Sequence, residues 1–124
     1  MSAPNIVNIT SIYGKTVFDA DISTSDDAIL TNAASSNKLL KVNSLIISNI
    51  DGGSAADITV TIKDASGTLK AKLAHTITVP ADATLVVISK DSAIYLEENM
   101  AIHLDASAAG DLAAVCSYEE MDDA

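Results

Sequence analysis

Hydrophobic and polar residues alternate along much of residues 42–119, and this alternation most constrains the fold. In Asp57-Ile-Thr-Val-Thr-Ile-Lys63, Ile and Val occupy every second position, with Thr between them. Because successive side chains of a strand point to opposite faces, this pattern is typical of an antiparallel strand with one buried face. The same period recurs in residues 75–79 and 100–104. We therefore predict a core that contains Ile58, Val60, Ile62, Ile77, Val79, Ile102 and Leu104.

Turn-forming residues interrupt the alternating segments roughly every 10–15 residues. They include Asp51-Gly-Gly-Ser54, Asp64-Ala-Ser-Gly67 and the run from Ser107 to Asp111. This spacing leaves no room for the crossover helices that parallel sheets need. The sequence thus predicts an all-β fold, an antiparallel β-sandwich of jelly-roll-like type with about 7–9 short strands. At least six of them should lie between Val42 and Tyr118.

The two ends of the chain are less regular. We expect residues 1–27 to form an extended arm or edge strands, residues 28–120 to form the sandwich, and residues 121–124 to form an acidic tail. Residues 28–32 and 38–42 are candidates for a hairpin, and a short helix capped by Asp26 is the alternative. Residues 112–118 fit a strand better than a helix, because Gly110 and a series of strands precede them.

Charge excludes one class of function. The formal net charge is −10, all seven basic residues are Lys, and residues 91–124 hold nine acids and no base. Proteins that bind nucleic acids need a basic surface, and Arg is the favoured contact to phosphate and guanine. We therefore expect no nucleic-acid partner. One Phe, three Tyr and no Trp also argue against a sugar-stacking pocket.

Cysteine content and hydropathy indicate the compartment. The chain has one cysteine, Cys116, so no internal disulfide can form, as is usual for a protein made in a reducing cytoplasm. Residues 1–5 lack the basic and apolar regions of a signal peptide. The longest apolar runs have about five residues, whereas a membrane span needs about 20. We therefore expect no membrane association.

No group of residues predicts catalysis or a cofactor. His75 and His103 are the histidines, and their spacing gives no reason for them to converge on a metal. Cys116 has no motif of a nucleophile around it and is expected to pack as a small hydrophobic residue. Asp19 and Asp21 share one strand face and could contribute to a structural calcium site, but an EF-hand pattern is missing. We predict no catalytic residue, no metal ligand, no cofactor and no enzyme activity.

Two further segments have alternative readings. Asp51-Gly-Gly53 lacks the rest of any phosphate-binding motif and is expected to be a turn. The uncharged run Leu85-Val-Val-Ile88 must be shielded from water. It is expected to be a central strand buried on both faces, or a strand with one face against another subunit.

Six segments have a distinctive residue order: ILTNAA at 29–34, KVNSLIISNID at 41–51, VPADATLVVISKD at 79–91, IYLEE at 94–98, AAGDL at 108–112 and SYEE at 117–120. Together they resemble small virion structural proteins of tailed bacteriophages, especially phages of marine bacteria and cyanobacteria. The resemblance covers about residues 28–120. Asn99 stands where this family often has Gly, and Cys116 where Val is expected.

The resemblance implies a structural role in the virion. It favours a capsid decoration or cement protein that forms a homo-oligomer and binds the major capsid protein or other virion proteins. The alternatives are a neck, tail or fibre component, or a carbohydrate-binding module for host recognition. The implied location is the virion, after synthesis in the cytoplasm of the bacterial host.

Overall fold

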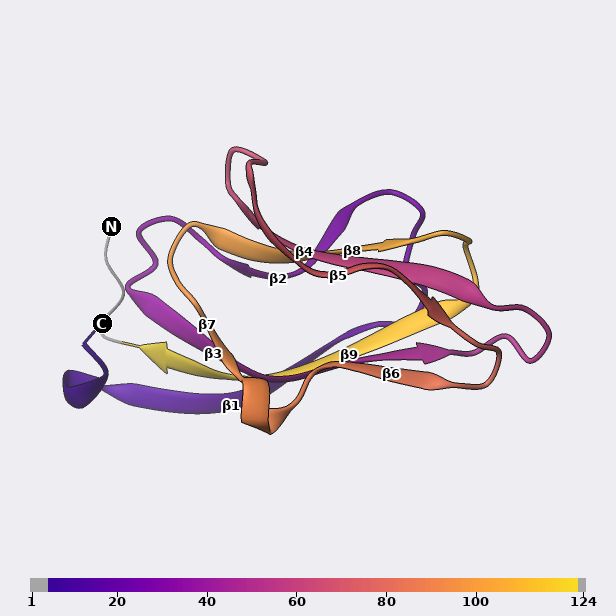
Figure 1. The fold of residues 1–124 in the computed structure, drawn as a ribbon. Coiled ribbons are helices and arrows are strands. Elements are labelled where there is room, and N and C mark those ends of the chain that lie inside the picture. The colour runs from indigo at the N-terminus through magenta and orange to yellow at the C-terminus, as the bar shows by residue number, and fades with distance from the viewer. Residues whose placement is uncertain (1–4, 123–124) are drawn as a thin grey trace.

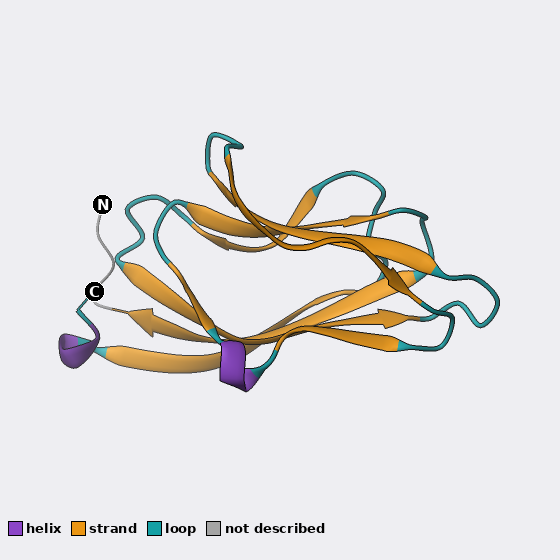
Figure 2. Cartoon of the chain, in the orientation of Figure 1, coloured by secondary structure: helices purple, strands orange, loops and turns teal. Residues whose placement is uncertain are grey.

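The chain folds as two antiparallel sheets that face each other. A computed structural model of the protein describes residues 5–122. Figure 1 shows the two layers, and Figure 2 shows that strands dominate the chain. Helix in the described residues is limited to two short 3-10 turns. None of the helical turns in this range is long and apolar enough to cross a membrane. The elements are η1 (Ile6–Asn8), β1 (Ser11–Asp19), β2 (Asp27–Asn32), β3 (Lys38–Asn49), β4 (Ala56–Asp64), β5 (Leu69–Val79), β6 (Thr84–Ile88), η2 (Lys90–Ser92), β7 (Ile94–Leu96), β8 (Met100–Ala106) and β9 (Leu112–Asp122).

The strand order is that of a jelly roll. The larger sheet has the order β1-β9-β3-β6, with β7 also paired to β3, and the smaller sheet has the order β2-β8-β4-β5. β6 and β7 pair with different parts of the same side of β3 and are separated by η2, so together they occupy one strand position. Each sheet then has four positions, as in a double-sheet jelly roll. The all-β sandwich predicted from the sequence is confirmed.

The core lies between the sheets and is made of aliphatic side chains. Of the predicted core residues, Ile58, Val60, Val79, Ile102 and Leu104 are buried, and Ile62 packs against the core while partly exposed. The prediction for Ile77 is wrong, because its side chain is 42 % exposed. Ile77 lies opposite Ile58 but on the edge strand β5, next to a bulge at Thr76, where φ is +47°. A bulged edge strand bends away from its partner and loses its cover.

The predicted hairpin of residues 28–32 and 38–42 is also wrong. Both segments are strands, but β2 pairs with β8 in the smaller sheet while β3 lies in the larger sheet. The connection between them crosses from one layer to the other. The short helix that was the alternative is likewise not formed, since Asp27 already belongs to β2.

Leu85–Ile88 is not a central strand. β6 lies at the end of the strand order, so it is an edge strand of the larger sheet. Leu85 and Val87 pack on the core, Ile88 is buried, and Val86 points outward and is exposed. Strict alternation is broken at Val87, where the pairing with β3 shifts. The alternative, in which one face of this strand meets another subunit, remains a prediction.

Two buried asparagines hold the crossover connections. The Nδ2 atom of Asn32 donates to the carbonyls of Lys38 and Leu96, both at 2.9 Å. The Nδ2 atom of Asn49 donates to the carbonyls of Ser54 and Val79, both at 2.9 Å. Each asparagine thus ties a strand end to the loop that follows and to a distant strand. Buried carbonyls at such chain crossings need partners, and a single amide supplies two donors.

The expected domain boundaries at residues 27/28 and 120/121 remain predictions. β1 lies within residues 1–27 and pairs with β9 along its whole length, so this part of the segment is an edge strand of the larger sheet. β9 continues to Asp122, and Met121 pairs with both Ile12 and Leu39. Residues 123–124 lie outside the described range.

Candidate functional site on the outer face of the larger sheet

An apolar row crosses the solvent side of the larger sheet. Phe18 of β1 lies opposite Val115 of β9, Val115 lies opposite Ile46 of β3, and Ile46 lies opposite Val86 of β6. Phe18 is 70 % exposed, Val86 55 % and Val115 38 %. With strands about 4.8 Å apart, the four positions span about 14 Å. We call Phe18, Val115, Ile46 and Val86 the outer apolar row.

The residues beside this row are small or nearly neutral. Thr16, Ser117 and Ser44 form the next row on the same face. Gly14, Glu119, Lys41 and Tyr95 form the row after that. The charged members of these rows are Glu119 and Lys41, which lie directly opposite each other. Contiguous exposed apolar surface on a sheet face with few charged side chains is typical of a protein interaction site.

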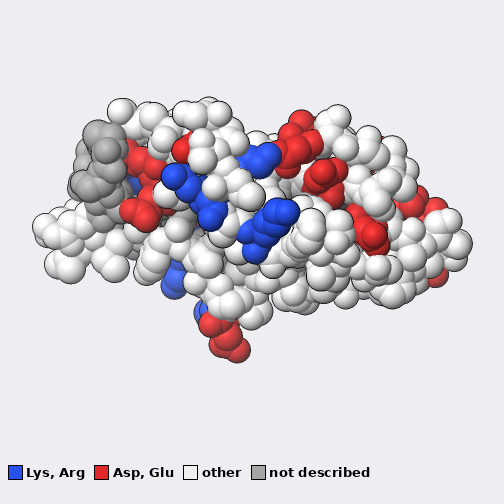
Figure 3. Space-filling view, turned by 45° about the horizontal axis from the view of Figure 1, so that its top comes forward, with Lys and Arg blue, Asp and Glu red and all other residues white. Residues whose placement is uncertain are grey.

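The outer face of the smaller sheet is polar. Thr61 lies opposite His103 and Thr59 opposite Asp105. Lys63 forms an ion pair with Asp26. Figure 3 shows that Lys and Asp or Glu side chains are both distributed over this side of the molecule. The two outer faces therefore differ, and the apolar one is the better candidate for contact with another protein.

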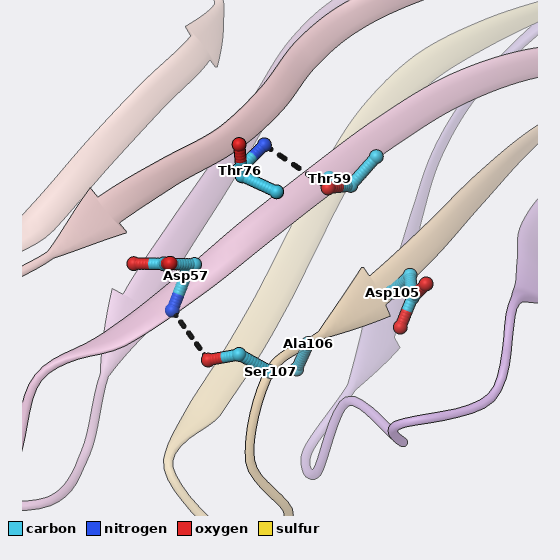
Figure 4. A pocket seen from close by; sticks show the side chains of 6 residues that line it. All are labelled: Asp57, Thr59, Thr76, Asp105, Ala106 and Ser107. Carbon is cyan, nitrogen blue, oxygen red and sulfur yellow. Dashed lines mark hydrogen bonds between the residues drawn. The ribbon is translucent and has the colours of Figure 1, made fainter.

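A small hollow of about 120 Å³ lies on the polar face. Figure 4 shows its lining, in which the amide of Thr76 donates to Oγ1 of Thr59 at 3.0 Å and the amide of Asp57 donates to Oγ of Ser107 at 2.8 Å. Asp105 contributes a second carboxylate, and no aromatic side chain lines the hollow. The hollow contains neither a nucleophile with a base beside it nor a platform for a sugar ring.

One end of the sandwich is acidic. Four loops meet there (the right of Figure 1), formed by residues 20–26, 50–55, 80–83 and 107–111. Backbone hydrogen bonds join the loops and the strand ends beside them. The amide of Ile50 donates to the carbonyl of Asp111, that of Ala106 at the end of β8 to Ser23, and that of Asn49 at the end of β3 to Ala83. Every loop carries at least one Asp and none carries Lys. We call these four loops the acidic loop end.

Asp111 is the least solvated carboxyl of this end. Burial raises its pKa, and so do a hydrogen bond with Asp51 and the negative charges of Asp51 and Asp21. These interactions disfavour the ionised form of Asp111 in the folded protein.

The possible calcium ligands Asp19 and Asp21 are both engaged with backbone amides. Oδ1 of Asp19 accepts from the amide of Asp21 at 3.1 Å, and Oδ1 of Asp21 accepts from the amide of Gly110 at 2.8 Å. Among residues 5–122, no three or more His, Cys, Asp or Glu side chains are grouped so as to hold a metal ion. The geometry assigns both carboxylates to loop structure.

The histidines lie apart. His103 is on β8, with Nδ1 3.5 Å from Oδ2 of Asp26, and His75 is on β5, with Nδ1 3.4 Å from Nζ of Lys72. β4 lies between these two strands, so the structure does not bring the imidazoles together. The Asp51-Gly-Gly53 segment is a turn, in which Oδ1 of Asp51 accepts from the amide of Gly53 at 2.9 Å.

Cys116 packs in the core, as the sequence predicts. Burial raises the pKa of its thiol to about 11. Because the thiolate is the reactive form, this cysteine is a poor nucleophile near neutral pH.

The sequence did not reveal the outer apolar row. Its members come from four strands that are far apart in the chain, and only the pairing register aligns them. The one available signal was the excess of apolar residues in Leu85–Ile88, which predicted a strand that needs cover on its second face.

The comparisons with known proteins show the fold. No protein-family model matches the chain, and no curated protein matches its sequence. A chain from the disulfide-linked pili of Bacillus endospore appendages matches with a TM-score of 0.52 and 11 % identity, over 98 % of this chain and 90 % of that chain. Chains from the viral particle and the subviral particle of infectious bursal disease virus match with TM-scores of 0.48 and identities of 10 % and 12 %. The match covers 92 % of this chain and only 36 % and 33 % of those two chains.

Proposed function

We propose that this protein is a structural component of a bacteriophage virion, and specifically a decoration or cement protein of the head. The outer apolar row carries the proposal. Four apolar residues aligned across a solvent-facing sheet would be shielded by contact with a protein lattice. Phe18 and Val86 mark its two ends, so the contact would extend over the whole width of the sheet.

Sequence resemblance supports the same assignment. Four of the six resembling segments fall on strands of the larger sheet, with residues 41–51 on β3, 79–91 around β6, 94–98 on β7 and 117–120 on β9. The chemistry of the described residues supports a structural rather than a catalytic role. The single thiol is buried, and the carboxylates of the calcium candidates bind backbone amides.

The net charge is consistent with a lattice contact through this face. Several of the acids that give the chain its charge of −10 lie at the acidic loop end and on the polar face, which carries Asp57 and Asp105. An apolar face directed to the capsid would leave those acids in solvent, where they repel neighbouring copies and keep particles apart. Each contact would be small, and many copies on one particle would make attachment stable through multivalency.

Purified virions test the proposal. Mass spectrometry of density-purified particles should detect the protein in stoichiometric amount, and cryo-EM should place it on the outer surface of the head. A position on neck, tail or fibre would replace the decoration role with the neck or tail role. A protein that is abundant in the lysate and missing from particles would refute both.

A matched pair of variants tests the surface. Val86→Lys should reduce incorporation into particles, because it puts a charge into the outer apolar row. Leu69→Lys on β5 is the control, since Leu69 is also an exposed aliphatic residue of an edge strand but belongs to the smaller sheet. Equal incorporation of both variants would exclude the outer apolar row as the contact.

A further inference from the structure

The four sheet edges differ in how well they are protected against pairing with another chain. β2 is six residues long and its pairing with β8 shifts between Ala28 and Leu30. The pairing of β5 with β4 shifts three times. The edge formed by β6 and β7 is interrupted by η2, and the pairing of β6 with β3 shifts between Leu45 and Ile46. Bulges, short strands and interruptions are the usual means of blocking edge-to-edge association.

β1 has none of these protections. Its nine residues pair with β9 in consecutive register without a shift. Within residues 5–122, no strand pairs with its other side. It also contains no proline. β1 is therefore a regular edge whose free backbone groups can continue the sheet.

The side chains of β1 favour an apolar partner. Ile12 is 59 % exposed and Phe18, at the other end, is 70 % exposed, and both point to the outer face. Gly14 lies between them, and a Cβ atom built at this position meets nothing within 4 Å. Packing within the chain therefore does not require a glycine here. Glycine inside a strand often marks a place where another backbone approaches.

We propose that β1 pairs antiparallel with β1 of a second copy of this chain, about a twofold axis at Lys15. This inference deepens the proposed structural role and rests on it. In this register Ser11 faces Asp19 of the second copy, Ile12 faces Phe18, and Tyr13 faces Val17, so all nine residues are paired. Ile12 and Phe18 of each strand then cover Phe18 and Ile12 of the other, and such pairs of an aliphatic and an aromatic residue across strands are favourable.

Charge permits the antiparallel arrangement and disfavours the parallel one. Lys15 would face Lys15 of the second copy, and like charges opposite each other are unfavourable, but each Nζ is 3.2 Å from Oε2 of Glu120 in the same chain and so keeps a counter-ion. The other charged residue of β1 is Asp19, at its end. The antiparallel orientation places the two acidic loop ends at opposite ends of the dimer, where their repulsion is weakest. A parallel arrangement would bring them side by side.

The pairing would join two larger sheets into one. The outer apolar row of each copy ends at Phe18, and the pairing would lengthen each row by Ile12 of the other copy. The two rows would lie on one continuous face, displaced from each other by six residues, or about 20 Å, along the strands. The dimer would thus present two apolar rows to a lattice. A twofold isologous contact of this kind closes by itself and forms no open fibre.

Cysteine cross-linking tests the register. Opposite residues of antiparallel strands have Cα atoms about 4.5–5.5 Å apart, within the range of a disulfide. A mixture of Ile12→Cys and Phe18→Cys proteins should form a disulfide-linked dimer on mild oxidation, and either variant alone should not. The buried Cys116 does not compete while the protein is folded. A cross-link in Ile12→Cys alone, or none in the mixture, would overturn the proposed register.

Light scattering over a concentration series tests the dimer. The wild-type protein should dimerise, Phe18→Lys should be monomeric, and Val86→Lys should still dimerise because it lies on the opposite edge of the same face. Circular dichroism checks that each variant is folded. A monomeric wild type, or equal loss of dimer in both variants, would overturn edge pairing. These measurements need no particles, so a dimer that is absent from virions would refute the proposed function and leave the pairing intact.

Discussion

Replacement of Asn49 by Ala should destabilise the fold strongly. The side chain is buried and makes three hydrogen bonds. Its Nδ2 donates to the carbonyls of Ser54 and Val79, both at 2.9 Å, and its Oδ1 accepts from the amide of Asp51 at 2.8 Å. Alanine removes all three partners and leaves backbone groups without compensation.

The size of the effect follows from these contacts. A hydrogen bond contributes about 1 kcal/mol net, and a buried group left without a partner costs about 1–3 kcal/mol. Water can reach the amide of Asp51 more easily than the Val79 carbonyl, because the contact to Val79 is buried and that to Asp51 is partly exposed. We therefore expect a loss of about 3 kcal/mol. With a urea m-value of about 1.5 kcal/mol per molar, the unfolding midpoint should fall by about 2 M.

The control lies on the same strand. Asn43 is partly buried, and its side chain makes no hydrogen bond with the described residues. Asn43→Ala removes the same atoms without breaking a hydrogen bond, so its midpoint should remain close to that of the wild type. Urea unfolding followed by circular dichroism measures both variants. A midpoint for Asn49→Ala that is no lower than that of Asn43→Ala would refute the argument that this amide holds the crossover.

Three further predictions concern the core, the acidic loop end and the thiol. Val60→Ala should lower the free energy of unfolding by about 1–3 kcal/mol, because Val60 is fully buried; an unchanged melting temperature would contradict its place in the core. The raised pKa of Asp111 means that the folded state binds more protons than the unfolded state above the ordinary value of 3.8, so stability should fall as pH rises through the window between the two pKa values. Asp111→Asn should remove this pH dependence from the urea midpoints taken between acid and neutral pH, and it should be more stable than the wild type at neutral pH. A stability that falls more steeply with pH in Asp111→Asn than in the wild type would contradict a raised pKa of Asp111. Cys116, with a pKa of about 11, should react with a thiol reagent at neutral pH only after unfolding, and rapid labelling of the native protein would show that the site is open.

Alternation alone was enough to predict the fold class and most of the core. In β4 the apolar residues Ile58 and Val60 point inward without a break in phase, so the period of two gave the correct face. Ile77 lies in an equally regular sequence, yet it is exposed. The prediction that Ile77 is buried fails because of the bulge at Thr76, and no local residue pattern distinguishes a bulged edge strand from a covered one.

Pairing between distant segments could not be predicted in the same way. Residues 28–32 and 38–42 have the length and turn of a hairpin, but β2 pairs with β8 in the smaller sheet and β3 lies in the larger one. Local propensity favours the nearest partner, whereas the jelly roll gains more buried area when successive strands alternate between layers. Asn32 is the residue that reveals this connection in the structure, since its amide bonds to both Lys38 and Leu96.

The outer apolar row depends on a change of phase within β3. Val42 packs in the core, and strict alternation from Val42 would place Ile46 inside as well. The register shifts between Val42 and Ser44, so that Leu45 and Ile47 point into the core and Ile46 points outward. Ile46 is the link between Val115 and Val86, because β3 lies between β9 and β6. Without the bulge the row would be interrupted at the centre of the sheet, and Phe18 and Val86 would be isolated apolar residues at opposite edges. The irregularity that hid this surface from sequence reasoning is therefore also what makes it continuous, and bulges that re-aim side chains in this way are features of the fold rather than defects.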